Sequence, residues 1–285
     1  MLVILTLLIF SNAPVISIEP KRPIQGSLFT ITVKQSDSPA LTGSFASQSL
    51  HFSPITGGFR AIAAVPVDAT GALTLEIVPD SATSTPDISP ETGLARPIRI
   101  PITIAKGSYR TQRLSVAGRF GREPDEATKA RIERDAAKAR QVSVNSHQTP
   151  RLWKLPFIKP AAGRVTSPFG TARVFNGQVK SRHTGLDFGG GTGAPVKAAN
   201  DGIVALLDSF YLGGNCLYLD HGAGFVTGYL HLSKWYVKPG QQVKKGQLIG
   251  RIGATGRVTG PHLHFIARYG TISVNPLSLF KLSGL

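Results

Sequence analysis

The sequence is poor in cysteine, in acidic side chains and in long apolar runs. Its single cysteine, Cys216, excludes an internal disulfide and gives no sign of an oxidising compartment, although it does not argue against export. The nearly unbroken apolar run at residues 2–10 is too short to cross a bilayer, which takes about 20 residues. No solenoid repeat is found, and no basic–aromatic pattern of the kind that stacks on nucleic-acid bases.

The shortage of acidic residues leaves a strongly basic chain. The 285 residues contain 32 Lys and Arg against 16 Asp and Glu, a formal net charge of +16. This excess predicts attraction to a polyanion, such as nucleic acid, an anionic membrane surface or an anionic cell-wall polymer. Apolar residues, at 41%, are enough to bury a core, while 31 glycines and 20 prolines favour short strands joined by tight turns.

The N-terminal half predicts an exported β-domain. Residues 1–17 have the apolar length of a secretory signal, so we expect export to the periplasm or cell envelope; the alternative is a buried first strand. Residues 18–120 alternate short strands with turn signals, which predicts a small, immunoglobulin-like β-sandwich. Pro97 and Pro101 mark its last strand as an edge. The expected strands lie at residues 28–33, 61–67, 73–78 and 98–104.

Residues 121–155 change character and predict a helical linker. Pro124 and the acidic residues after it are typical of a helix N-terminus, and residues 125–142 are rich in Ala, Lys and Arg. The apolar face is thin, mostly alanine with Ile132. This pattern fits either a linker helix that lies on a neighbour or a largely solvated basic helix.

Residues 156–285 predict a second, antiparallel all-β domain. Nearly every turn carries glycine, and apolar segments of four to eight residues recur. Residues 237–250, with glycines at the tight places, predict a hairpin. The five apolar segments lie at residues 203–207, 216–219, 224–230, 247–252 and 262–267. The fold class expected for the whole chain is therefore all-β, with one linker helix.

The candidate catalytic and metal-binding residues lie in this second domain. His262 and His264 lie in a predicted strand, whose alternate residues share a face, so their imidazoles should lie about 6.6 Å apart. His183 and Asp187 are four residues apart, but Gly185 between them argues for a strand and turn rather than a helix. Two nitrogens and one carboxylate oxygen suit Zn²⁺, which keeps one open position in catalytic sites. The third ligand would come from the strand with the two histidines.

The order of these motifs resembles a known enzyme family. His183-x-x-x-Asp187, His231-Leu232-Ser233 and His262-x-His264 are similar to the zinc-dependent peptidoglycan endopeptidases of family M23, also called LytM or lysostaphin-type peptidases. The resemblance covers about residues 156–276. Supporting matches are Ser167-Pro168-Phe169-Gly170, Gly193-Ala194-Pro195-Val196, Asp201-Gly202, Asp220-His221-Gly222 and residues 253–264.

The resemblance implies a division of roles among the five residues. His183, Asp187 and His264 would hold one Zn²⁺ per chain, and His231 and His262 would be unligated catalytic residues. Zinc-activated water would attack a peptide bond in a peptidoglycan stem or cross-link, and His262 would take its proton. His231 would hydrogen-bond the oxyanion or steady His262. Which imidazole is the main base stays open.

Two neighbouring positions bear on activity. Relatives often carry a tyrosine shortly before the first ligand, and the best match here is Phe175, which lacks the hydroxyl. Asn176 could coordinate zinc in a latent form, as an asparagine does in some relatives.

We expect a monomer that binds peptidoglycan and anionic envelope polymers, with no specific nucleic acid and with an envelope partner for the N-terminal domain. One alternative is a non-catalytic M23-like regulator that binds cell wall. A carrier domain of the lipoyl type is disfavoured, because residues 237–250 lack the signature of a modified lysine.

Overall fold

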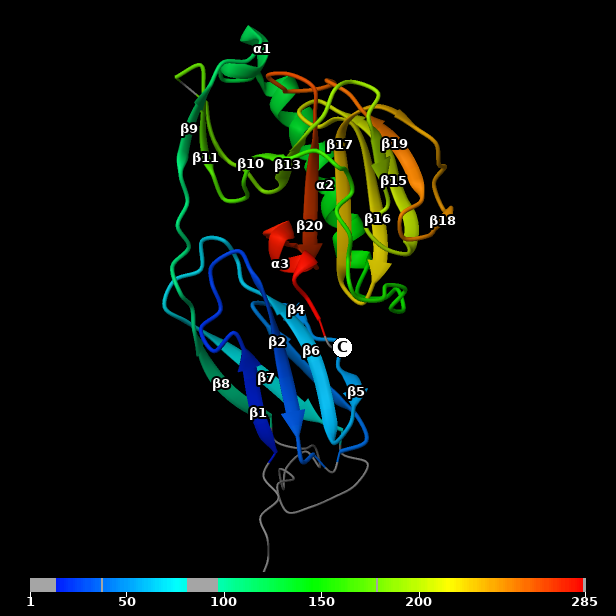
Figure 1. The fold of residues 1–285 in the computed structure, drawn as a ribbon. Coiled ribbons are helices and arrows are strands. Elements are labelled where there is room, and N and C mark those ends of the chain that lie inside the picture. The colour runs from blue at the N-terminus through cyan, green and yellow to red at the C-terminus, as the bar shows by residue number, and fades with distance from the viewer. Residues whose placement is uncertain (1–13, 37, 81–96, 178, 284–285) are drawn as a thin grey trace, which may run out of the picture.

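The computed structural model describes residues 14–36, 38–80, 97–177 and 179–283, and the expected signal segment lies mostly outside them. The chain forms an N-terminal pair of small sheets and a larger C-terminal β-domain (Figure 1). The all-β fold class with a linker helix is thus confirmed. Within the described ranges, no helix has the length and apolarity needed to span a membrane.

Two four-stranded antiparallel sheets make the N-terminal region. Phe29 and Phe45, from different sheets, meet edge to face with ring centroids 5.0 Å apart, so the sheets share one core. One sheet is ordered β1 (Val15–Glu19), β2 (Leu28–Lys34), β6 (Gly58–Ala64), β5 (Ser53–Ile55). The other is ordered β4 (Gln48–Ser49), β3 (Leu41–Phe45), β7 (Ala72–Pro79), β8 (Ile98–Thr103), and the proline-containing β8 is an edge strand as predicted.

The chain then crosses to the C-terminal region earlier than the sequence indicates. Strand β9 (Thr111–Leu114) falls inside the range 18–120 expected for the sandwich. It pairs instead in parallel with β11 (Ala172–Phe175), which also pairs with β12 (Val179–Arg182). In Figure 1 this strand rises alongside β11, far from the sheet that contains β8.

The linker helix rests on its neighbour, the first of the two expected arrangements. After the short α1 (Gly118–Gly121), α2 (Glu126–Asn145) begins where Asp125 accepts a hydrogen bond from the Thr128 amide. Its C-terminal half buries Ala139 and Val142 against Phe210, Cys216, Tyr218, Val226, Leu230 and Ile266 of the sheet behind it. The N-terminal half of the helix stays largely exposed.

A ten-stranded sheet forms the C-terminal domain. Its continuous path is β10 (Val165–Ser167), β13 (Leu186–Gly189), β20 (His262–Tyr269), β17 (Phe225–Trp235), β16 (Gly214–Gly222), β15 (Gly202–Phe210), β18 (Gln242–Val243). Strand β14 (Pro195–Lys197) pairs with β19 (Leu248–Ile252), β21 (Ile272–Val274) pairs with β20, and α3 (Pro276–Phe280) closes the chain.

The hairpin predicted for residues 237–250 is wrong. Strand β18 pairs with β15, and β19 pairs with β14 and β17. The glycines do mark turns, with positive φ at Gly240 and Gly246, but each turn leads into a different partner strand. The five other apolar segments are confirmed as parts of β15, β16, β17, β19 and β20.

Candidate metal centre

Strand pairing brings the first two candidate residues together. Asp187 on β13 lies directly opposite His264 on β20, and Leu230 on β17 flanks His264 on the other side. His183 lies in the turn just before β13. Its amide donates to the Thr171 carbonyl at 2.8 Å, which fixes this turn against the loop that follows β10.

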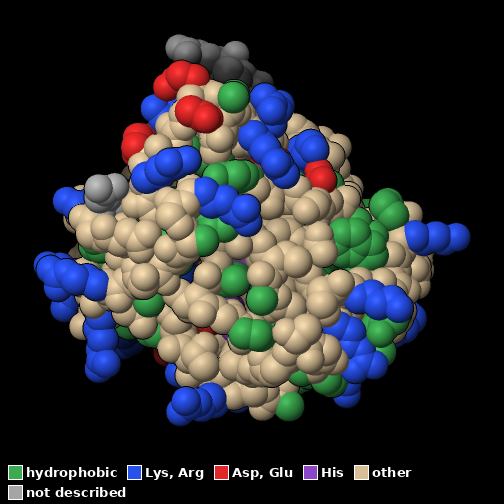
Figure 2. Space-filling view, turned by 90° about the horizontal axis from the view of Figure 1, so that it is seen from above, with side chains coloured by type: hydrophobic (Ala, Val, Ile, Leu, Met, Phe, Trp, Pro, Cys, Tyr) green, Lys and Arg blue, Asp and Glu red, His purple; other side chains and the backbone are tan. Residues whose placement is uncertain are grey.

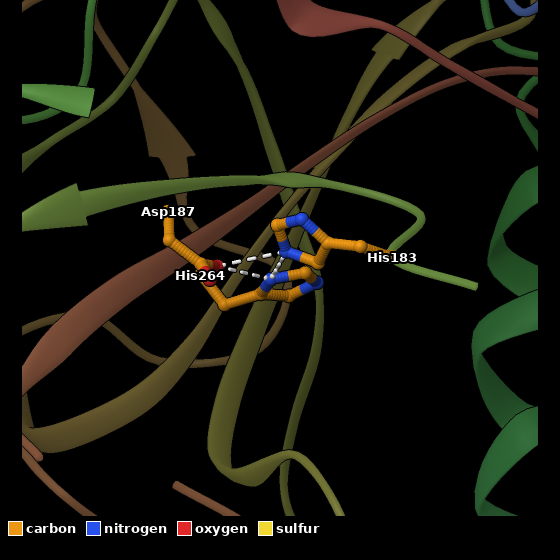
Figure 3. A group of neighbouring side chains, drawn as sticks. All are labelled: His183, Asp187 and His264. Carbon is orange, nitrogen blue, oxygen red and sulfur yellow. Dashed lines mark hydrogen bonds and ion pairs between the residues drawn. The ribbon is translucent and has the colours of Figure 1, made fainter. Parts of the chain in front are cut away.

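The three side chains converge on one point (Figure 3). His183 Nε2 and His264 Nδ1 each approach Asp187 Oδ1, at 2.9 and 2.7 Å, and lie 2.9 Å from each other. All three residues are buried. Among the residues that the structure describes, this is the one group of three His, Cys, Asp or Glu side chains close enough to hold a metal ion.

Hydrogen bonding fixes the tautomer of His183. Its Nδ1 lies 2.8 Å from the Pro168 carbonyl, which can only accept, so Nδ1 carries a proton and Nε2 is the ring nitrogen that faces the other two side chains. Asp187 Oδ1 is also an acceptor. His183 Nε2, His264 Nδ1 and Asp187 Oδ1 each have a lone pair to give when unprotonated, so all three could bind one cation.

These residues fit a zinc ion. Zinc takes imidazole nitrogen and carboxylate oxygen at about 2.0–2.2 Å, which puts tetrahedral ligands about 3.3 Å apart. The three atoms here lie 2.7–2.9 Å apart, so each needs to retreat by only a fraction of an ångström. Gly185 makes the close approach feasible, because a Cβ there would lie 2.6 Å from His264 Cε1.

Asp187 is kept ionised and oriented. Burial raises its pKa, but the contacts with His183 and His264 outweigh burial, and the net pKa is lowered far below the usual range. Arg173 Nη2 donates to Asp187 Oδ2 at 2.5 Å and to Ser167 Oγ at 2.8 Å. This clamp on one carboxylate oxygen leaves the other to face the histidines.

His231 and His262 stand beside the cluster without joining it. Their ring centroids lie 4.9 Å apart, and that of His231 lies 5.9 Å from that of His264. His262 Nε2 is 3.8 Å from Asp187 Oδ1, beyond hydrogen-bonding range. The sequence therefore placed all five residues in one neighbourhood, three in direct contact and two adjacent.

A bulge in β17 aims His231 at the site. Tyr229 pairs with Leu217 and Leu232 with Asn215, so β17 has one extra residue between the two pairs. His231 lies in this interval with φ +65°, an uncommon conformation for a residue with a side chain. The strain is concentrated at a residue that points to the cluster, which is where functional strain tends to occur.

Both adjacent histidines use Nδ1 as a hydrogen-bond donor, which leaves Nε2 as the ring nitrogen available to a substrate. His231 Nδ1 donates to the Thr255 carbonyl at 2.8 Å, and His262 Nδ1 donates to the Gly260 carbonyl at 2.9 Å. Burial, then repulsion from His264 and His262, lowers the pKa of His231 well below its ordinary value. Neutral His231 can thus accept a proton at Nε2, but it cannot donate from that atom until it has been protonated.

Two hollows flank the cluster. One, of about 260 Å³, is lined by Asp187, His262 and Gln112 of β9 among others. The second, of about 190 Å³, is lined by His183, His231 and His264 among others. Arg173, Phe175 and Arg257 line both hollows. An extended chain laid along them would pass over the three converging ligand atoms.

Other sequence candidates lie elsewhere. Phe175 is buried and offers no hydroxyl to the hollows. Asn176 exchanges hydrogen bonds with the Val116 backbone, at 2.9 and 3.0 Å, and is not in the cluster. His221 is a core residue held by the Asp201 carbonyl and the Thr227 hydroxyl. The sequence did not single out Arg173 or Arg257. Their roles depend on whether each guanidinium has an acidic partner in the folded protein, which the sequence does not tell.

Two imidazoles and a carboxylate converge beside open hollows, with two further histidines next to them, and this arrangement is typical of the catalytic sites of metal-dependent hydrolases. Residues 181–276 match the sequence model of peptidase family M23. This part of the C-terminal domain is therefore an M23 peptidase domain, which confirms the resemblance seen in the sequence.

Individual relatives agree. Residues of this chain are 41% identical over 133 residues to the peptidoglycan DD-endopeptidase ShyC of Vibrio cholerae, covering 45% of this chain and 30% of ShyC. They are 49% identical over 105 residues to ShyA of the same organism, covering 36% of this chain and 24% of ShyA. The match thus spans a third or less of these curated relatives.

One solved structure is similar over almost the whole chain. A protein of Pseudomonas aeruginosa assigned to peptidase M23 has a TM-score of 0.70 and 26% identity, covering 91% of this chain and 95% of that one. The similarity therefore includes the N-terminal sheets as well as the peptidase domain.

Proposed function

We propose that this protein is a zinc-dependent endopeptidase that hydrolyses peptide bonds in the stems or cross-links of bacterial peptidoglycan, in the cell envelope. The observation that carries the proposal is the convergence of His183, Asp187 and His264 beside two hollows. The two curated relatives are named peptidoglycan DD-endopeptidases, which supports this substrate class.

Two imidazole nitrogens and one carboxylate oxygen are a typical ligand set for zinc. His183 Nε2, His264 Nδ1 and Asp187 Oδ1 would hold Zn²⁺. When bound, zinc supplies a Lewis acid that polarises a carbonyl and makes water easier to deprotonate. Arg173 keeps Asp187 in place by holding its second oxygen.

The neighbouring histidines handle protons. His262 Nε2 is open to the hollow that Asp187 lines, so it takes a proton from the attacking water and returns it to the leaving amine. Burial lowers the pKa of His231, so its Nε2, on the side of the second hollow, is unprotonated at neutral pH. His231 becomes a donor to the oxyanion only after it has accepted a proton, so His262 is the better placed first base.

The positive charge supports an envelope location. Lys and Arg side chains surround the face seen in Figure 2, and acidic side chains are sparse there. Such a surface attracts the anionic polymers of the cell envelope, and ions in solution screen the attraction. Binding to isolated sacculi should weaken as salt rises, which a sedimentation assay measures.

The test of the function is digestion of purified sacculi followed by mass spectrometry of the released muropeptides. The wild type should release cross-link cleavage products and bind one zinc per chain, and His183→Ala should do neither. His51→Ala removes a histidine outside the site and should keep both properties. Zinc-loaded wild type that leaves sacculi intact would contradict the proposal and favour a non-catalytic wall-binding regulator.

A further inference from the structure

Arg257 lies beside the candidate metal centre, and no counterion for it is found among the residues that the structure describes. It lies in the turn between β19 and β20, where its amide donates to the Leu212 carbonyl at 2.9 Å. Its guanidinium stacks on the Phe175 ring, 4.1 Å from the centroid. Among the described residues, no hydrogen bond or ion pair to this guanidinium is found.

The position of Arg257 relates it to the reaction site. It lines the hollow that contains Asp187 and His262, and also the hollow that contains His183 and His264. The guanidinium therefore borders the place where the scissile bond of a substrate would lie.

The neighbouring arginine is different. Arg173 also lines both hollows, but its charge is matched by Asp187 at 2.5 Å. Burial, then repulsion from Arg173, lowers the pKa of Arg257 to about 10, so Arg257 remains protonated at neutral pH. A largely desolvated cation with no partner is costly unless an anion pairs with it.

The planar guanidinium of Arg257 favours a carboxylate over other anions. A guanidinium presents parallel N–H donors that match the two oxygens of a carboxylate, and stacking on an aromatic ring holds the fork in one plane. Phe175 provides that ring. The residue that stands where relatives often carry a tyrosine therefore positions the guanidinium of Arg257.

We propose that Arg257 determines specificity by binding a free carboxylate on the substrate residue that donates the scissile nitrogen; this inference rests on the proposed function. In a D-alanyl–diaminopimelate cross-link, the carbon bonded to that nitrogen carries a free carboxylate. In a glycine bridge, the corresponding carbon carries an amide and no charge. Arg257 thus selects the first kind of cross-link over the second.

The test uses two synthetic cross-linked dimers that differ only in whether the diaminopimelate carboxyl next to the scissile nitrogen is free or amidated. Loss of a charge-assisted hydrogen bond should cost about 10- to 100-fold. Arg257→Met should lower kcat/KM for the free-acid dimer by about that factor and leave the amidated dimer unchanged. Arg257→Lys should restore part of the preference. Equal losses on both dimers, or no preference in the wild type, would overturn the proposal.

Arg134→Met is the matched control, because it removes the same charge from the exposed face of α2. It should leave the preference intact. Zinc content and the circular dichroism spectrum of each variant should equal those of the wild type.

A binding measurement separates failure of this inference from failure of the proposed function. If the wild type cuts neither dimer, the proposed function fails for this substrate, and calorimetric titration of both dimers into His262→Ala still tests Arg257. Tighter binding of the free-acid dimer that is lost in His262→Ala/Arg257→Met supports the carboxylate site. Equal binding of the two dimers, or binding of neither, overturns it.

Discussion

Two pairs of histidines in this molecule have the same contact and different surroundings. His183 Nε2 and His264 Nδ1 lie 2.9 Å apart in the C-terminal domain. His51 Nε2 and His147 Nδ1 lie 2.9 Å apart where the N-terminal sheets meet the segment that follows α2. Distance between imidazoles alone therefore does not distinguish a metal centre.

The surroundings do distinguish them. The first pair shares the ionised Asp187, which is clamped by Arg173. The second pair lines a cavity of about 310 Å³ with aromatic neighbours, and none of the described residues that line it is Asp or Glu. The rings of His51 and His147 are stacked, 5.2 Å apart, as neutral imidazoles pack. Asp187, on the strand opposite His264, makes the first pair suitable for binding a cation. The pair His51 and His147 has no such carboxylate among its described neighbours and is a packing contact.

The largest effect should come from removing that carboxylate. Asp187→Asn keeps the shape of the side chain and removes the charge, so zinc should be lost and kcat/KM should fall by at least about a thousandfold, or about 4 kcal/mol. His147→Ala should keep zinc and activity. Zinc per chain by mass spectrometry, with muropeptide release, checks both. A zinc-loaded Asp187→Asn protein would remove the distinction between the two pairs.

Removing the adjacent base should be the next largest effect. His262→Ala should lower kcat by about 10²- to 10⁴-fold, the usual contribution of a general base, and should leave one zinc per chain. Rates with a synthetic cross-linked peptide and zinc analysis of the same sample measure both. If zinc were lost along with activity, His262 would be a ligand rather than a neighbour of the site.

The sequence predicted the site better than the contacts around it. The alternation on β20 indicated only that His262 and His264 share a face, because strand periodicity is encoded locally. The choice of His264 as the third ligand came from the resemblance to family M23. The partner of a strand is not encoded in the same way. Residues 237–250 look like a hairpin by turn and apolar pattern, yet β18 and β19 do not pair with each other: β18 pairs with β15, and β19 pairs with β14 and β17.

The arginines and the second histidine pair show the same limit. Arg257 is one of 32 basic residues, and nothing in the sequence tells that it lacks a counterion. His51 and His147 are 96 positions apart and meet only because the sheets dock beside Trp153 and Tyr269. These features depend on tertiary contacts that no local pattern reports.

Acid should destabilise the folded protein through buried histidines in both regions. Burial, then repulsion from His51, lowers the pKa of His147 to about 4. Burial lowers the pKa of the core residue His221 to about 4 as well. The unfolded value is near 6.5, so both residues take up protons on unfolding. Their contribution is complete above pH 6.5 and is lost as pH falls toward 4.

For His221 the loss is up to about 1.4 kcal/mol per pH unit, or about 3 kcal/mol in total. The loss is smaller for the half-buried His147, where solvent screens the charge. Urea unfolding between pH 7 and pH 4.5 measures the slope. His147→Gln should give a shallower slope than the wild type. Parallel slopes would mean that His147 is protonated in the folded protein at these pH values.

The smallest effect concerns the clamp on Asp187. Arg173→Lys keeps the charge but cannot hold Asp187 Oδ2 and Ser167 Oγ in the geometry of Arg173 Nη2, so zinc affinity should fall by about tenfold, the lower end for residues that orient a ligand. Arg151→Lys is the matched change beside His51 and His147, since Arg151 stacks on Trp153 and lines the cavity of about 310 Å³ there. It should leave zinc affinity unchanged. Competition with a zinc chelator measures both affinities. Unchanged affinity in Arg173→Lys would mean that pairing across β13 and β20 is sufficient to orient the carboxylate, and that the difference between the two histidine pairs lies in Asp187 alone.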